Sequence, residues 1–205
     1  MYYFLLGLIS GTPFGFSLGP VFFTIKETSL KRGFIAGVIV SLGILVSDLL
    51  YVVLISLGFA AAFSDDFSKS IFSFLGGAML VAFGISFLIK RIDITTREDV
   101  EVSKKAFQSF MKGFLVNTLN PYVAIFWAAT VAFAKVELNL TGLDVQFYLA
   151  GFLANLLIAD ILKAYLAQRL KGRLTSRLNL FYRIIGIIFL AFGAKLLFES
   201  FSIVW

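Results

Sequence analysis

Six long apolar stretches, separated by short polar segments, follow one another along the chain. An α-helix needs about 20 consecutive apolar residues to cross the hydrocarbon core of a bilayer, and the six stretches have that length. The pattern therefore predicts an all-α integral membrane protein. Its six transmembrane helices are expected over Tyr3–Ile25, Phe34–Leu57, Ile71–Ile89, Phe110–Ala134, Phe147–Ala167 and Phe181–Phe201.

The fourth stretch is interrupted by polar residues and a proline at its centre. Pro121 has no N–H, so we expect the carbonyl of Asn117 to lose its helical partner. Asn117 and Asn120 are three residues apart, which places their side chains on one helical face beside this loosened backbone. Broken backbone is tolerated in a membrane only inside protein or beside a water-filled cavity. This segment therefore predicts a place where something polar is bound or passed.

The first stretch carries a similar interruption, because Gly19 and Pro20 follow Pro13 within a glycine-rich segment. Glycines allow a neighbouring backbone to approach closely. The segment is either an unwound part of the helix that faces the break in the fourth stretch, or a kinked and tightly packed helix. The matching break at Pro121 favours the unwound segment.

The composition supports a membrane protein and excludes several kinds of chemistry. Hydrophobic residues make up 60% of the chain and charged residues only 15%, compared with about 25% charged residues in a soluble domain. The absence of cysteine and histidine excludes thiol relays, Cys/His zinc sites, haem ligation by these residues and imidazole acid–base catalysis. No nucleophile–base pair is recognisable. We therefore expect no enzyme, no catalytic residue, no resident metal and no cofactor.

The positive charges indicate the orientation of the predicted helices. The net charge is +6, but the basic residues cluster in the first, third and fifth links, which membrane topology explains better than nucleic-acid binding. The positive-inside rule then places both termini outside and these links in the cytoplasm. We expect a multi-pass protein of the cytoplasmic (inner) membrane, with one transmembrane domain over 1–205. It divides into repeat one at 1–89, a charged cytoplasmic link at 90–109 and repeat two at 110–205.

The two halves of the chain resemble each other in three places. An odd number of spans per half makes the second copy enter from the opposite side, so two three-helix repeats must be inverted. Such repeats are common in secondary transporters, whose broken helices meet near the midplane. The matching segments are Gly77–Gly84 with Gly186–Gly193, Ser17–Pro20 with Thr118–Pro121, and the spans that carry Asp48 and Asp160.

Acidic residues inside the predicted spans are the main candidates for transport chemistry. A carboxylate such as Asp48 costs roughly 2.5–3.5 kcal/mol at the bilayer centre, so it must be protonated, hydrated or paired. Asp48 could meet a substrate amine or carry a proton, or it could form an interhelical hydrogen bond. Asp160 can pair with Lys163 three residues later, and Lys163 could instead snorkel to the interface. Tyr122 and Trp127 flank the break in the fourth stretch and could line a pocket or pack as ordinary aromatic residues.

The predicted sites follow from these observations. No metal site is expected. For proton coupling we expect Asp48 and Asp160. For substrate binding we expect Gly19, Pro20, Asp48, Asn117, Asn120, Pro121, Tyr122 and Trp127.

With these residues in view, the chain resembles the LysE/RhtB family of amino-acid exporters. The matching motifs are Gly19-Pro20, Lys31–Gly37, Gly43–Asp48, Asn117–Pro121 and Gly186–Gly193. The resemblance implies an inner-membrane exporter of amino acids or close derivatives, driven by protons or by the membrane potential, with two inverted repeats. The chain departs from the family at Leu18, where a proline is usual, and at Tyr122, where many relatives have lysine.

Two other functions fit the same spans. Asp48, Asp160 and the asparagine side chains offer oxygen ligands suited to a hard cation, so the cargo could be a divalent metal. The chain could also be a non-transporting membrane subunit whose small-residue faces dock partner helices. The expected partners are the lipid bilayer, a small-molecule substrate and a coupling ion, with a homodimer as one assembly open to the chain.

Overall fold

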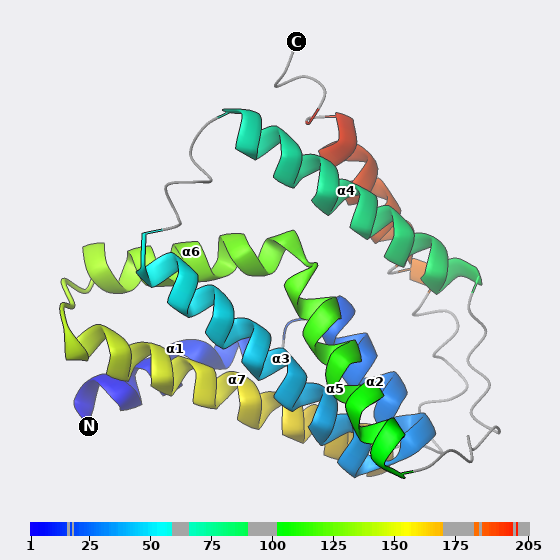
Figure 1. Cartoon of the computed structure of the whole chain (residues 1–205), viewed down its shortest axis with the longest axis horizontal. Coiled ribbons are helices and arrows are strands. Elements are labelled where there is room, and N and C mark those ends of the chain that lie inside the picture. The colour runs from blue at the N-terminus through cyan, green and yellow to red at the C-terminus, as the bar shows by residue number, and fades with distance from the viewer. Residues whose placement is uncertain are drawn as a thin grey trace.

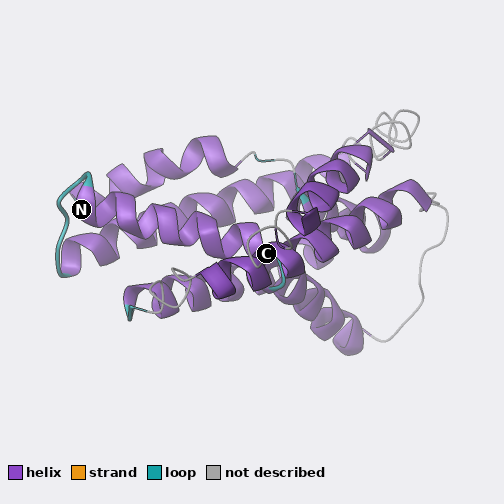
Figure 2. Ribbon diagram, turned by 90° about the horizontal axis from the view of Figure 1, so that it is seen from above, coloured by secondary structure: helices purple, strands orange, loops and turns teal. Residues whose placement is uncertain are grey.

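The fold is known from a computed structural model, which describes residues 1–15, 17, 19–58, 66–89, 102–169, 183–184, 186–198 and 200. Within these ranges the chain is helical and contains no strand, which confirms the predicted all-α class (Figures 1 and 2). The helices are α1 (Tyr2–Gly15), α2 (Pro20–Arg32), α3 (Phe34–Ser56), α4 (Asp66–Ile89), α5 (Val102–Thr118), α6 (Pro121–Val136) and α7 (Leu143–Arg169). A further apolar helix, Gly186–Phe198, follows.

The described helices contain between two and four candidate membrane spans. Helices α3 and α7 are each long and apolar enough to cross a bilayer. Two bent pairs, α1 with α2 and α5 with α6, pass the same test when each pair is taken as one span. The prediction of six spans therefore stays a prediction, and parts of the expected sixth span (181–182, 185, 199 and 201) lie outside the described residues.

The first and fourth predicted spans are not continuous helices. The axes bend by 80° between α1 and α2 and by 68° between α5 and α6. Helix α1 runs through Pro13 and ends at Gly15, so the break falls between Gly15 and Pro20. Helix α5 begins at Val102, inside the cytoplasmic link expected at 90–109, while residues 90–101 lie outside the described part.

The most closely packed helix pairs each consist of one helix from the first half of the chain and one from the second. Helix α1 lies along α7, and α3 lies along α5 (Figure 1). Glycines permit this approach, because a Cβ atom added to any of them would collide with the backbone of the partner helix. They are Gly7 and Gly151 in the first pair, and Gly43 and Gly113 in the second.

Helix α4 and the helix Gly186–Phe198 form a third pair, which Figure 1 shows apart from the other helices. The contacts are reciprocal. A Cβ on Gly77 would lie 2.8 Å from the carbonyl oxygen of Gly193, and one on Gly193 would lie 2.8 Å from that of Gly77. Gly84 and Gly186 face each other in the same way, at 2.8 and 2.9 Å. The two helices are therefore antiparallel and touch at their backbones.

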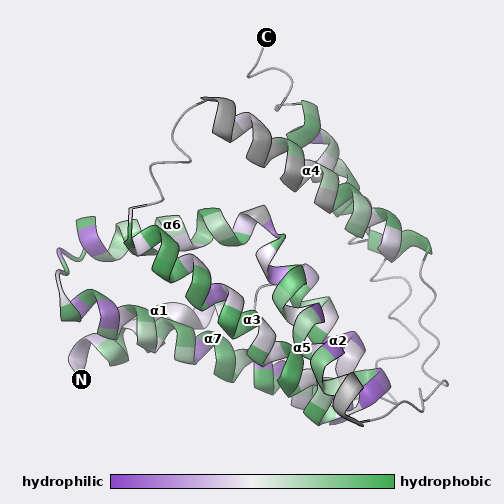
Figure 3. Ribbon diagram, viewed as in Figure 1, coloured by the Kyte–Doolittle hydropathy of each residue, from purple (hydrophilic) through white to green (hydrophobic). Residues whose placement is uncertain are grey.

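The remaining surface is largely apolar, as a lipid-facing surface requires (Figure 3). Ile9, Ile35 and Ile125 are 67%, 66% and 62% exposed. The buried core lies where α1, α3, α6 and α7 meet, with Trp127 and Tyr148 at its centre. The polar side chains of Asp48, Asn117, Asn120 and Asp160 are buried.

Candidate functional site

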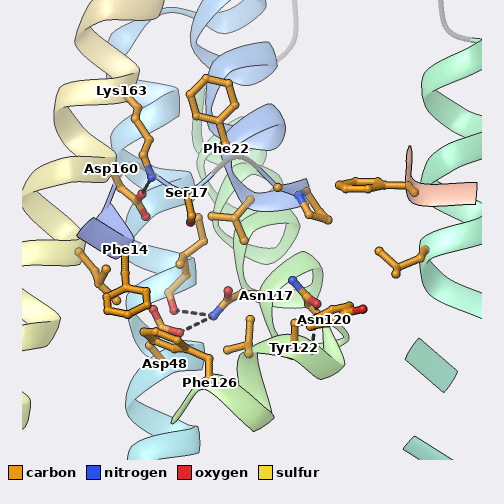
Figure 4. A pocket seen from close by; sticks show the side chains of 18 of the residues that line it. Phe14, Ser17, Phe22, Asp48, Asn117, Asn120, Tyr122, Phe126, Asp160 and Lys163 are labelled. Atoms are coloured by element: carbon orange, nitrogen blue, oxygen red, sulfur yellow. Dashed lines mark hydrogen bonds and ion pairs between the residues drawn. The ribbon is translucent and has the colours of Figure 1, made fainter. Parts of the chain in front are cut away.

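A cavity of about 480 Å³ lies between the two broken spans, within the roughly 300–1,000 Å³ typical of small-molecule sites. Figure 4 shows side chains from several helices pointing into it. Both breaks, α3, α7 and the pair formed by α4 and Gly186–Phe198 contribute to its wall. The lining residues are Phe14, Ser17, Gly19, Pro20, Val21, Phe22, Ile44, Asp48, Leu80, Asn117, Asn120, Tyr122, Val123, Phe126, Leu156, Asp160, Lys163, Ile188, Phe189 and Phe192.

Each break is followed by a helix that begins with proline. Pro20 and Pro121 stand in the first turn of α2 and α6, where the missing N–H has no intrahelical partner to lose. Asn120 caps α6, because its side-chain oxygen accepts a hydrogen bond from the backbone N–H of Tyr122 at 3.2 Å. The break in the second half is therefore a defined turn with its own cap.

The carbonyl of Asn117 has lost its helical partner at Pro121, as expected, but it accepts a hydrogen bond from the backbone N–H of Asn120 at 3.1 Å. The expected shared face of the two asparagines is wrong. Asn117 and Asn120 do not share a helical face, since α5 ends at Thr118 and Asn120 has an extended backbone. The turn satisfies the backbone locally, so side chains supply the polar groups of the second break.

Asp48 is held by two donors from the second half of the chain. Its Oδ1 accepts hydrogen bonds from Asn117 Nδ2 at 2.7 Å and from Trp127 Nε1 at 2.8 Å. The side chain is 6% exposed and reaches the cavity wall. Among the described residues, no hydrogen bond reaches its other oxygen, Oδ2. The interhelical hydrogen bond is therefore present, and one carboxylate oxygen stays open to a ligand.

Residues of α3 next to Asp48 form hydrogen bonds with the last residue of α5. The Tyr51 hydroxyl donates to the carbonyl of Thr118 at 2.5 Å. The Thr118 hydroxyl donates to Ser47 Oγ at 2.8 Å. Because Ser47, Asp48 and Tyr51 lie on one side of α3, a single helix face fixes the break in position.

Asp160 and Lys163 form the second polar part of the wall. Lys163 Nζ lies 2.7 Å from Asp160 Oδ1, one turn apart on α7. Figure 4 shows this pair at one end of the group of side chains and Asp48 with Asn117 at the other. Lys163 thus faces the cavity and its counterion, whereas snorkelling would have turned it to the membrane interface.

Three phenylalanine rings also line the cavity, and they were not among the expected site residues. Phe14 and Phe126 line the cavity with their centroids 5.2 Å apart, and both pack on Phe152. Phe22 lines it from the start of α2. The chain has 25 phenylalanines, so no spacing in the sequence distinguishes these three.

Most of the predicted site residues meet at the cavity. Its lining includes Gly19, Pro20, Asp48, Asn117, Asn120, Tyr122 and Asp160. Trp127 does not line it, because it is fully buried behind Asp48 and holds that side chain by a hydrogen bond. Pro121 opens α6 beside it. The two breaks and both acidic residues are therefore brought together, while their roles in binding stay predictions.

Comparison with known proteins identifies relatives over most of the chain. A family model described as LysE type translocator matches residues 14–200. An uncharacterized membrane protein of Synechocystis sp. is 26% identical over 183 residues, which cover 86% of each chain. No solved structure matches the chain.

Proposed function

The chain belongs to the LysE type translocator family, and we propose that it is a secondary exporter of amino acids or close derivatives. Transport would cross the cytoplasmic membrane and be driven by protons or by the membrane potential. The observation that carries this proposal is the cavity between the two broken spans, with a buried carboxylate on its wall. An intramembrane ionisable residue beside a cavity is a typical feature of substrate and proton pathways.

In this proposal Asp48 Oδ2 meets the substrate ammonium or carries the coupling proton. The donors Asn117 and Trp127 occupy Oδ1 and fix the direction of the carboxylate. Asn117, Asn120 and Tyr122 supply polar groups at the second break, while Gly19 and Pro20 let the backbone of the first break border the cavity. Asp160 is the second group placed to exchange a proton.

Alternating access would expose this cavity first to one side of the membrane and then to the other. The matching breaks and the reciprocal glycine contacts of α4 with Gly186–Phe198 support an inverted repeat. Each closely packed pair, however, takes one helix from each half. We therefore infer that the helix pairs move relative to one another during transport. A motion of the whole first half against the whole second half would instead separate the helices of each pair. The basic links support an orientation with both termini outside.

The two other functions have less support. Within the described ranges, no three acidic side chains come close enough to form a cation site, and Asp160 is already paired with Lys163. A divalent metal would thus find few ligands. If the chain were a non-transporting subunit, the breaks would be expected to enclose no cavity. The cavity of about 480 Å³ is the observation against this alternative.

Counterflow in proteoliposomes tests the proposed function. The purified protein would be reconstituted, loaded with single amino acids and assayed at two pH values, with divalent cations as a parallel set and empty liposomes as the control. We expect uptake of a labelled amino acid that depends on the loaded one. Transport of a cation alone would favour the metal exporter, and no counterflow in either set would reject the exporter.

A further inference from the structure

A second, smaller hollow lies between the end of α2 and the neighbouring helix α5 (Figure 1). Its volume is about 170 Å³, below the roughly 300–1,000 Å³ of most small-molecule sites, so it suits a compact chemical group. Its lining residues are polar or charged, whereas the lining of the large cavity is mostly apolar. We call this hollow the basic pocket, and its lining residues are Glu27, Thr28, Lys31, Arg32, Gln108 and Lys112.

Positive charge predominates in the basic pocket. Lys31, Arg32 and Lys112 line it together with one carboxylate, that of Glu27. This carboxylate lies 3.1 Å from Lys31 Nζ on α2 and 3.7 Å from Lys112 Nζ on α5. Because three cations outnumber one carboxylate, the pocket attracts an anion. The positive-inside rule explains the sign of these charges, but not their convergence from two helices on one hollow.

A buried hydroxyl group in the pocket wall has no partner in the described part of the chain. Thr28 is 3% exposed, and its Oγ1 makes no hydrogen bond. Thr24 and Ser29, on the same helix, each donate to the backbone carbonyl four residues earlier. A buried donor without a partner is unfavourable, because it has given up its hydrogen bonds to water. A ligand that accepts a hydrogen bond from Thr28 would remove this cost.

The other donors come from one face of each helix. Thr28, Lys31 and Arg32 are three and four residues apart, so they share a face of α2. Gln108 and Lys112 share a face of α5 in the same way. Lys31 forms one ion pair among the described residues, while an ammonium group has three N–H donors. A guanidinium group fits the oxygens of a phosphate with two parallel hydrogen bonds. Hydroxyl, ammonium, guanidinium and amide donors thus surround a space of limited size.

We propose that the basic pocket binds a phosphate group, carried by an anionic phospholipid or by a soluble phosphate compound. The several acceptor oxygens of a phosphate match the donors of the wall, and its negative charge matches the surplus of cations. Basic pockets between membrane helices on the cytoplasmic side are typical sites for lipid head groups. Helix α2 follows the first break and α5 precedes the second, so the bound group joins the two broken spans at their basic ends.

Matched ligands identify the recognised group and its source. Dioleoylphosphatidic acid and dioleoylglycerol have the same acyl chains, but only the first carries a phosphate. Inorganic phosphate and glycerol 3-phosphate present the phosphate without acyl chains, and acetate presents a different anion. Equilibrium binding would be measured on the purified full-length protein in a neutral detergent. We expect saturable binding of phosphatidic acid and at least tenfold weaker binding of dioleoylglycerol. Weak binding of both soluble phosphates would identify a lipid as the source, and affinities comparable to that of phosphatidic acid would identify a soluble compound.

The variant Thr28→Val separates binding from stability. Valine has nearly the shape of threonine but lacks the hydroxyl group, so the ligand-free variant should be at least as stable as the wild type. Loss of a hydrogen bond to a charged group should weaken phosphate binding by about 10- to 100-fold, and Lys31→Met should have a similar effect. The matched controls Thr141→Val and Lys135→Met change exposed residues outside the pocket and should leave the affinity unchanged.

Several outcomes would overturn the inference. Equal binding of phosphatidic acid and dioleoylglycerol, or no binding of any phosphate compound, would exclude a phosphate site. Acetate binding as tightly as inorganic phosphate would show that the pocket does not select phosphate. Unchanged affinity in Thr28→Val or in Lys31→Met would place the phosphate elsewhere, and a less stable ligand-free Thr28→Val protein would show that the hydroxyl group serves the fold. These measurements do not depend on counterflow, so they leave the exporter function to its own test.

Discussion

Asp48 has two oxygens with different tasks. Oδ1 takes the two hydrogen bonds that join α3 to the second broken span, and Oδ2 remains for a ligand. In the function proposed above, this side chain stabilises the fold through its shape and would serve transport through its charge. The two contributions can therefore be separated by a substitution that keeps the shape.

Asp48→Asn should abolish export while the protein still inserts. An asparagine oxygen can accept the same bonds from Asn117 and Trp127, but it brings no negative charge to the ligand. Losing one partner of a buried charge pair costs about 2–5 kcal/mol, which corresponds to at least a roughly 30-fold drop in rate. Counterflow measures this drop in the transport rate, and Glu137→Gln, at an exposed residue, is the control. Unchanged transport would remove Asp48 from the mechanism.

Asn120→Ala should weaken the fold at the second break. It deletes the oxygen that accepts from the Tyr122 N–H, and loss of such a cap costs about 1 kcal/mol. The free energy of unfolding in mixed micelles reports this loss, and Asn120→Ser should retain most of the stability. If alanine and serine variants unfold alike, the cap does not stabilise α6.

Single residues could be predicted where their chemistry is unusual for a membrane. Asp48, Asp160 and Asn120 were found because polar groups inside apolar stretches need a reason. Trp127 was expected to line the pocket, but its indole N–H turns to Asp48 and its ring is buried. Phe14, Phe22 and Phe126 are apolar like their neighbours, so only the fold reveals that they face the cavity.

At the scale of helices, the backbone contacts between glycines determine which elements pack together. The pair formed by α4 and Gly186–Phe198 illustrates this, because Gly77 and Gly193 touch at their backbones. A side chain at either position would push the helices apart. The neighbouring Ala78 is exposed on the same helix and offers a comparison at almost the same depth.

Gly77→Val should destabilise the protein by about 1–3 kcal/mol, the usual cost of forcing extra methyl groups into a filled contact. Ala78→Val adds a similar volume outside the contact and should change the free energy of unfolding by less than about 0.5 kcal/mol. The free energies of unfolding of the two variants would be compared in mixed micelles. Equal stability of both variants would show that α4 does not pack on this helix through Gly77.

The sequence predicts helices better than it predicts their bends. Helices α3 and α7 match the expected spans within a few residues, because long apolar stretches determine them directly. The breaks at Pro20 and Pro121 were expected, but their bend angles depend on the helices packed around them. Pro13 lies inside α1, which continues through it to Gly15.

For the molecule as a whole, the important feature is that helices from both halves alternate around one cavity. The repeated glycine motifs predicted that the halves are related, but a glycine does not identify its partner helix. The pairings of α1 with α7 and of α3 with α5 therefore emerge only from the fold. Residues from both halves therefore line the cavity, which fits the alternating access proposed above.

Cargo protection of a single cysteine at the first break tests this account most directly. The chain has no native cysteine, so Ser17→Cys places one thiol on the cavity wall. A charged methanethiosulfonate reagent should block counterflow of the Ser17→Cys protein, and saturating amino acid should protect it. The control Ser86→Cys, exposed on α4 outside the cavity, should keep its transport after labelling. Labelling at Ser17→Cys that neither blocks transport nor responds to cargo would show that cargo does not pass between the broken spans.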